Sequence, residues 1–152
     1  MRELLIALAL VAVAAGVAGV VRRRSAIAAP SQPASFVVPA QLDRGDFDRP
    51  DVPWLVVVFS SAACASCAQV VEKARVVACA EVVVQEVEHG AARRLHERYS
   101  IDAVPTLAVA DAEGVVRAGF VGPVTATDLW AAVAEARRPG SSPEPGLGRD
   151  SL

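Results

Sequence analysis

Cysteine is scarce in this chain, with three residues among 152. Three cysteines are too few for the disulfide framework that stabilises many small secreted domains. Basic residues are not in excess either, because the net charge is −2. Without a basic surface on which phosphates collect, nucleic-acid binding has no support from composition. Two of the three cysteines, Cys64 and Cys67, form one C-x-x-C. This spacing points to redox chemistry or to metal binding.

Hydrophobic residues make up 53% of the chain and charged residues 21%, which is enough apolar content for one folded domain. The apolar content is unevenly placed, because residues 4–21 contain no charged side chain. As a helix rising about 1.5 Å per residue, this run reaches roughly 27 Å, close to the hydrocarbon thickness of a bilayer. Gly16 and Gly19 are costly in a soluble helix but common in membrane helices. We therefore expect an N-terminal transmembrane helix.

Three arginines at 22–24 follow the apolar run directly, whereas Arg2 and Glu3 nearly cancel before it. The positive-inside rule then predicts a single-pass protein of the plasma membrane with its domain on the cytoplasmic side. A cleaved signal peptide is an alternative, since residues 12–14 are small and follow a short apolar region. A buried helix of a soluble protein is a second alternative. With a signal peptide or a reversed anchor, the domain would be extracytoplasmic.

Composition divides the chain into four parts. Residues 1–24 are expected to form the transmembrane anchor with its arginine flank, and the proline-bearing residues 25–35 a linker. Residues 36–138 carry the apolar runs of the folded domain. Residues 139–152 hold three prolines and three glycines with little to bury, so we expect a disordered tail.

The domain alternates strand-like and helix-like segments, which indicates an α/β fold with a central mixed sheet flanked by helices. The run at 54–59 is wholly apolar and rich in β-branched residues, as in a strand covered on both faces. A turn at 111–114 joins two segments of a predicted hairpin, and Thr127 and Asp128 are predicted to cap the last helix. The expected strands are 36–38 at an edge, 54–59, 82–87, 106–110 and 115–120, and the expected helices are 67–77, 91–99 and 129–137.

Cys64 falls where a buried strand is followed by a helix. Ser60 and Ser61 supply N-cap chemistry just before it. Free N–H groups and the dipole at a helix N-terminus stabilise a thiolate, which is the reactive form of cysteine. Cys67 lies about one turn further on, within reach of a mixed disulfide formed by Cys64. The sequence therefore predicts Cys64 as the nucleophile and Cys67 as the resolving thiol.

Three linked segments resemble the thioredoxin superfamily: WLVVVFSSAACASC at 54–67, YSIDAVPTL at 99–107 and FVG at 120–122. The resemblance extends over residues 36–137. It implies a thioredoxin-like fold and a protein-disulfide oxidoreductase that needs no cofactor and no metal. It also implies that the Val104–Pro105 peptide bond is cis and faces the cysteines, with the Val104 backbone binding an extended substrate segment. The short anchor, arginine cluster and single domain resemble small membrane-tethered bacterial proteins of this kind.

The chain departs from the family pattern at two places. Thioredoxins usually carry Trp-Cys-Gly-Pro-Cys, whereas this chain has Ala63 before the first cysteine and Ala65-Ser66 between the two. The family's buried aspartate, which assists proton transfer to the resolving thiol, is replaced by Val58, and no carboxylate stands nearby in the sequence. Resolution through water or another base is then expected to be slower. The resemblance does not decide between a reductase and an oxidase.

The resulting hypothesis is a membrane-anchored oxidoreductase, held by residues 4–21, that exchanges disulfides with protein or small-molecule substrates and uses an unidentified electron donor. The main alternative is a thioredoxin-fold interaction module without catalysis. A less favoured one is a structural zinc site, although the spacing fits no usual zinc pattern. Cys79 is interpreted as a small buried hydrophobe, the histidines as solvated residues without a role, and Arg93 and Arg94 as a solvated face. The ligands counted for zinc are Cys64, Cys67 and Cys79 with His89 or His96.

Overall fold

The computed structural model describes residues 37–142 and residue 148. The predicted anchor at 4–21 with its arginine flank, the linker at 25–35 and the alternative cleavage site at 12–14 lie outside the described residues. So does most of the predicted tail at 139–152. In the part of the chain that is described, no helix has both the length and the apolar character needed to cross a bilayer.

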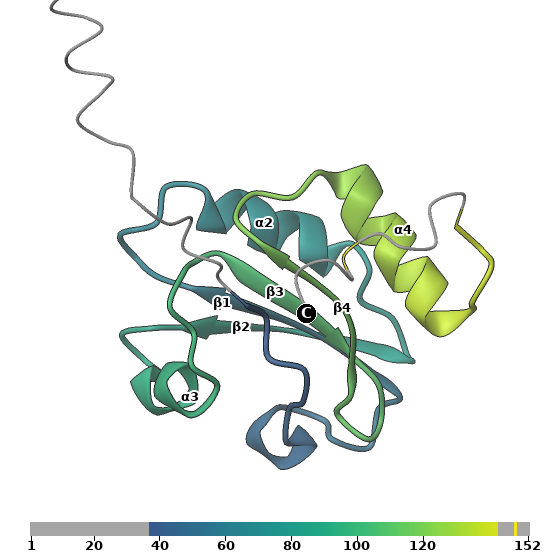
Figure 1. Ribbon diagram of the computed structural model, residues 1–152, viewed down its shortest axis with the longest axis horizontal. Coiled ribbons are helices and arrows are strands. Elements are labelled where there is room, and N and C mark those ends of the chain that lie inside the picture. Colours follow the sequence, from purple (N-terminus) through teal and green to yellow (C-terminus); the bar gives the residue numbers. More distant parts are fainter. Residues whose placement is uncertain (1–36, 143–147, 149–152) are drawn as a thin grey trace, which may run out of the picture. The chain divides into compact units, whose positions relative to one another are not determined.

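In the part of the chain that the structure describes, four strands form one mixed sheet in the order β2-β1-β3-β4 (Figure 1). Strands β1 and β2 run parallel, while β1–β3 and β3–β4 are antiparallel pairs. Helices α2 and α4 cover one face of the sheet, and α3 lies on the other (Figure 1). The predicted α/β fold, a central mixed sheet flanked by helices, is confirmed. The strands are β1 (Trp54–Ser60), β2 (Val82–Glu88), β3 (Thr106–Ala110) and β4 (Val116–Val121).

Strand β1 is the centre of the core. From Leu55 to Ser60 every residue is buried. Because side chains alternate along a strand, Val56 and Val58 pack under the helices α2 and α4, whereas Leu55 and Phe59 pack on the opposite side. This two-sided burial explains why the run is apolar throughout rather than alternating with polar residues.

In the described residues, three α-helices flank the sheet: α2 (Cys67–Arg75), α3 (Arg93–Arg98) and α4 (Ala126–Arg137). The N-cap of α4 is Thr125, whose hydroxyl oxygen accepts a hydrogen bond of 3.1 Å from the Asp128 N–H. The predicted cap at Thr127 and Asp128 is wrong. Thr125 has the extended backbone that a cap requires, and Thr127 already lies inside the helix.

The predicted edge strand at 36–38 is also wrong for the residues described. Residues 37–40 form no strand, and pairing with the β4 side begins only at an isolated bridge between Gln41 and Val115. The Val116 N–H donates to the carbonyl of Ala40 at 3.0 Å. Pro39 has no N–H to donate, so a regular ladder cannot continue through it.

Candidate functional site

The two predicted catalytic cysteines are joined as a disulfide directly after β1, with their Cα atoms 5.4 Å apart. Cys64 lies in the turn before α2, where its N–H donates to the Ser61 carbonyl at 2.9 Å. The helix begins at Cys67, and its N-cap Ser66 makes no side-chain cap bond. The predicted helix start at Cys67 is confirmed, but the prediction that Ser60 and Ser61 supply its N-cap is wrong. Cys64 lies before the first helical turn and is partly exposed.

The two cysteines differ in their exposure to solvent. Cys67 is 3% exposed and faces the core, whereas Cys64 is partly exposed. Cys67 belongs to the buried face of α2, on which Val70 and Val71 also lie. A partner in solution can thus reach Cys64 before it can reach Cys67.

Glu88, at the end of β2, holds the turn that precedes Cys64. Its carboxylate accepts hydrogen bonds from the N–H groups of Ala62, at 3.1 Å, and Ala91, at 2.9 Å. The backbone N–H groups of Gly90, Ala62 and Ala91 lower the pKa of Glu88 from its ordinary value of 4.5. The ionised carboxylate therefore ties the cysteine-bearing turn to the neighbouring strand.

The lowered pKa of Glu88 predicts a contribution to stability that depends on pH. A carboxylate with a depressed folded pKa stabilises above its unfolded pKa, and this contribution is lost as the pH falls through the folded value. Glu88→Gln is expected to lower the free energy of unfolding near pH 7 and to make it less sensitive to acid between about pH 5 and pH 2. Urea unfolding of both proteins across this range measures the effect.

The exposed residue Glu72 provides the matched control, because its carboxylate forms an ion pair with Arg75 on its own helix. Glu72→Gln should leave the acid dependence as in the wild type. Equal acid dependence in the wild type and the Glu88→Gln variant would show that the Ala62 contact contributes nothing.

A shallow hollow of about 420 Å³ lies beside Cys64. Val104 forms part of its wall, so the structure places this predicted substrate-binding residue beside Cys64. The Val104–Pro105 peptide bond is cis, and the Pro105 carbonyl accepts a hydrogen bond of 2.7 Å from the Gly122 N–H. No lining residue of the hollow carries a charge: they are Ser61, Ala63, Cys64, Ala65, Ser66 and Val104.

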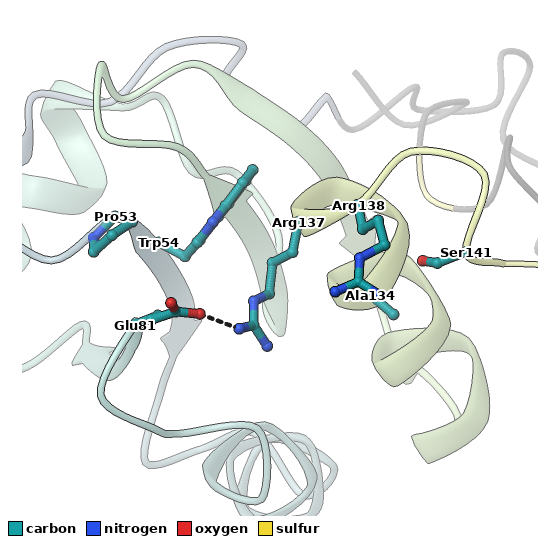
Figure 2. A pocket seen from close by; sticks show the side chains of 7 residues that line it. All are labelled: Pro53, Trp54, Glu81, Ala134, Arg137, Arg138 and Ser141. Carbon is teal, nitrogen blue, oxygen red and sulfur yellow. Dashed lines mark hydrogen bonds and ion pairs between the residues drawn. The ribbon is translucent and has the colours of Figure 1, made fainter.

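A second cavity, of about 440 Å³, lies at the other end of β1, where the strand begins at Trp54 (Figure 2). Arg137 reaches across it to form an ion pair with Glu81 (Figure 2). These charges neutralise each other, and no cysteine or histidine lines the cavity. We therefore place the candidate site at the cysteines. The lining residues are Pro53, Trp54, Glu81, Ala134, Arg137, Arg138 and Ser141.

The residues counted toward a zinc site do not converge. In the described part of the chain, no group of three or more histidine, cysteine or acidic side chains is placed to hold a metal ion. Cys79 is exposed, so the prediction of a buried residue is wrong. It pairs with Val82 in the turn between α2 and β2, outside the packed layers.

His96 differs from its prediction as well. It is 3% exposed, and its Nε2 lies 2.9 Å from the carbonyl oxygen of Val87. Its ring meets the edge of Phe59 at 5.3 Å between centroids, because this face of α3 packs on the sheet. His89 is exposed, as expected of a solvated histidine. His96 is a structural residue in this position.

One acidic residue near the site was missed from the sequence. Val58 is paired in register with Glu86 on the parallel strand β2. The Ser60 hydroxyl, one pleat further along β1, donates to Glu86 Oε1 at 2.7 Å. A carboxylate therefore stands next to the position where thioredoxins carry theirs, but on the adjacent strand. Only the strand register reveals it.

Comparison with protein-family models and with curated protein sequences gives no match to the chain. Among solved structures, a point mutant of thioredoxin from Halobacterium salinarum NRC-1 aligns with a TM-score of 0.52 at 18% identity. The alignment covers 70% of this chain and 96% of that one. The fold is thioredoxin-like. A structure titled as a malarial protein aligns at a TM-score of 0.49 and 17% identity, covering 55% of this chain and 97% of that one.

The thioredoxin-like fold and the joined cysteines together indicate a redox type of function. A structural alignment at 18% identity shows the fold alone. The activity has to be argued from the site. The site supports oxidoreductase chemistry at that general level, because Cys64 and Cys67 lie at disulfide distance, with Cys64 partly exposed and Cys67 buried.

Proposed function

We propose that the protein is a thiol–disulfide oxidoreductase in which Cys64 is the nucleophile and Cys67 the resolving thiol. The observation that carries the proposal is the disulfide between a partly exposed and a buried cysteine in a thioredoxin-like fold. The substrates are disulfides of partner proteins or small molecules. An electron donor of unidentified nature must return the pair to the dithiol state.

The exchange proceeds in two steps, each of which forms one S–S bond and breaks another. The Cys64 thiolate attacks a substrate disulfide, forms a mixed disulfide and releases one substrate thiolate. The Cys67 thiolate then attacks the Cys64 sulfur and releases the second substrate thiolate. Two electrons pass to the substrate, and the Cys64–Cys67 disulfide remains. The reverse sequence oxidises a substrate dithiol.

The hollow beside Cys64 provides the proposed substrate site. Val104 lines it, and Pro105 follows Val104 at the start of β3. An extended partner segment along the Val104 backbone would place its cysteine sulfur next to Cys64. The uncharged lining favours a substrate segment without charged side chains.

Replacing Cys67 by serine should trap the intermediate. The variant keeps the accessible Cys64 but has no thiol to release the partner, so a mixed disulfide is expected to accumulate, at least about tenfold above the wild type. Full-length Cys67→Ser protein in detergent, incubated with a cysteine-containing peptide under mild oxidation, is analysed by non-reducing electrophoresis and mass spectrometry.

The rival function, a non-catalytic interaction module, gives a different result. Partner capture would then survive when both Cys64 and Cys67 are replaced by serine. If the Cys67→Ser variant forms no adduct at Cys64, the oxidoreductase proposal is wrong.

We further propose that residues 4–21 anchor the protein in the plasma membrane as a single span, with the domain on the cytoplasmic side. The support is the uncharged apolar run and the arginines at 22–24. An extracytoplasmic domain is the alternative. Digestion of the domain by external protease in intact cells would contradict the cytoplasmic placement.

A further inference from the structure

We propose that Glu86, acting through the Ser60 hydroxyl, takes up the proton of the Cys67 thiol when Cys67 resolves the mixed disulfide. This inference rests on the proposed function, because it assigns a proton acceptor to the second step of that exchange. It gives a role to the hydrogen bond between the buried Ser60 hydroxyl and the partly exposed Glu86 carboxylate, which the two cysteines alone do not explain.

Resolution requires a proton acceptor because the thiolate, and not the thiol, attacks a disulfide. Cys67 is 3% exposed, and the residues that share its helix face, Val70 and Val71, are buried and apolar. A proton leaving this sulfur therefore has little direct contact with bulk water. A polar group within the protein is needed to receive it.

The alternation of strands β1 and β2 places such a group under α2. Val56 and Val58 on β1 pack in the core beneath α2 and α4, and Ser60 follows on the same face. Ser60 is 1% exposed, so its hydroxyl is as secluded as Cys67. Glu86 projects from the same face of β2, because its register partner on β1 is Val58.

The geometry of this pair suits a relay. The Ser60 hydroxyl donates to Glu86 Oε1 at 2.7 Å, which leaves the hydroxyl oxygen free to accept another proton. The Glu86 side chain is 37% exposed. The carboxyl group can therefore pass a proton on to solvent after each turnover. Ser60 is the inner, buried end of the relay, and Glu86 is its outer end.

Charged side chains on α2 and on β2 lie near Glu86. Arg75 on α2 lies 3.8 Å from Glu86 Oε2, and its positive charge compensates that of the carboxylate. The other carboxylate at this end of β2, Glu88, is already engaged by the N–H groups of Ala62 and Ala91. Glu86 is thus the carboxylate whose side-chain partner is a buried hydroxyl.

In this step, proton transfer precedes the attack of the Cys67 thiolate. The Cys67 proton moves to the Ser60 oxygen while the Ser60 proton moves to the Glu86 carboxylate. The Cys67 sulfur then forms a bond to Cys64, the Cys64–substrate S–S bond breaks, and the substrate leaves as a thiolate. Glu86 finally releases its proton to water. No further oxidant or reductant takes part.

The test separates the two steps of the exchange in time. Reduced full-length protein in detergent is mixed with oxidised glutathione, and acid-quenched samples are analysed by mass spectrometry for the Cys64 mixed disulfide. Glu86→Gln keeps the shape and the hydrogen bond but not the proton acceptor. We expect it to slow resolution about tenfold to a hundredfold at pH 7, and to leave the rate of Cys64 attack unchanged. Ser60→Ala should slow resolution similarly.

The pH profile distinguishes proton transfer from a structural effect. The rate at which Cys67 resolves the mixed disulfide should increase with pH. If Glu86 accepts the proton, this increase occurs at a higher pH in the Glu86→Gln variant than in the wild type. Glu72→Gln, on the exposed side of α2, should match the wild type at every pH. If Glu86→Gln slows resolution by the same factor at every pH, or does not slow it, the inference is wrong while the proposed function stands. If the wild type forms no mixed disulfide at Cys64, the proposed function itself fails and the inference with it.

Discussion

Replacing Cys64 by serine is expected to reduce disulfide exchange at least about a thousandfold, to the level of the uncatalysed reaction. A serine hydroxyl does not ionise near neutral pH, and Cys67 is too buried to meet a substrate directly. The measurement is turnover of a peptide disulfide by the full-length protein in detergent, with a chemical reductant supplying electrons. The expected loss follows from the position of Cys64 as the accessible sulfur of the pair.

Cys79 offers a matched control on the same chain, because it is a free and exposed cysteine in the turn before β2. Cys79→Ser is expected to keep the wild-type rate. A Cys64→Ser protein that retains a substantial part of the activity would place the chemistry elsewhere. If Cys79→Ser loses activity instead, Cys79 and not Cys64 is the nucleophile.

Replacing Phe59 by alanine is expected to lower the free energy of unfolding by about 3–5 kcal/mol. Phe59 is 0% exposed in β1, where its ring meets His96 at 5.3 Å and Tyr99 at 6.2 Å between centroids. Truncation removes these contacts and leaves a cavity between the sheet and α3. Urea unfolding, followed by circular dichroism with a common slope for both proteins, measures the difference.

Phe59→Leu is the graded control, because leucine refills part of the space. Its loss of stability should be well below that of the alanine variant. A loss below about 1 kcal/mol for Phe59→Ala would contradict the packing described for this face. The experiment also tests whether the strand that leads into Cys64 depends on its core contacts.

The sheet was predictable where one local pattern decides the structure. The apolar run at 54–59 corresponds to β1, and the segment 106–110 corresponds to β3 (Thr106–Ala110). Both runs are buried on two faces, so hydrophobicity alone identifies them. The cap of α4 was misplaced by two residues, because Thr125 and Thr127 offer the same chemistry and only backbone geometry separates them.

Tertiary contacts account for the features that sequence did not predict. His96 was predicted to be solvated because it stands between charged residues, yet it faces Phe59 across the layers. Arg44 is buried, with hydrogen bonds of 2.8 Å to the carbonyls of Asp111 and Val52, and burial lowers the pKa of its guanidinium. No local pattern signals an arginine that satisfies distant backbone carbonyls.

Some residues of the candidate site could be predicted from the sequence, and one could not. Cys64 and Cys67 were found from their spacing and their place after an apolar strand, and Val104 from the family resemblance. Glu86 could not be found, because it stands far from the cysteines along the chain. Its approach to Ser60 depends on the parallel register of β1 and β2.

The central claim is that Cys64 and Cys67 exchange reversibly between dithiol and disulfide. We would equilibrate the full-length protein in detergent with graded ratios of reduced to oxidised glutathione, quench with an alkylating reagent and count the modified cysteines by mass spectrometry. The account predicts a single two-electron transition, with Cys64 and Cys67 protected together and Cys79 alkylated throughout. Its position, near about −270 mV as in thioredoxin or near about −120 mV as in a strong oxidant, would give the direction of exchange. Failure of the pair to form an intramolecular disulfide at any ratio would contradict the account and favour a binding module.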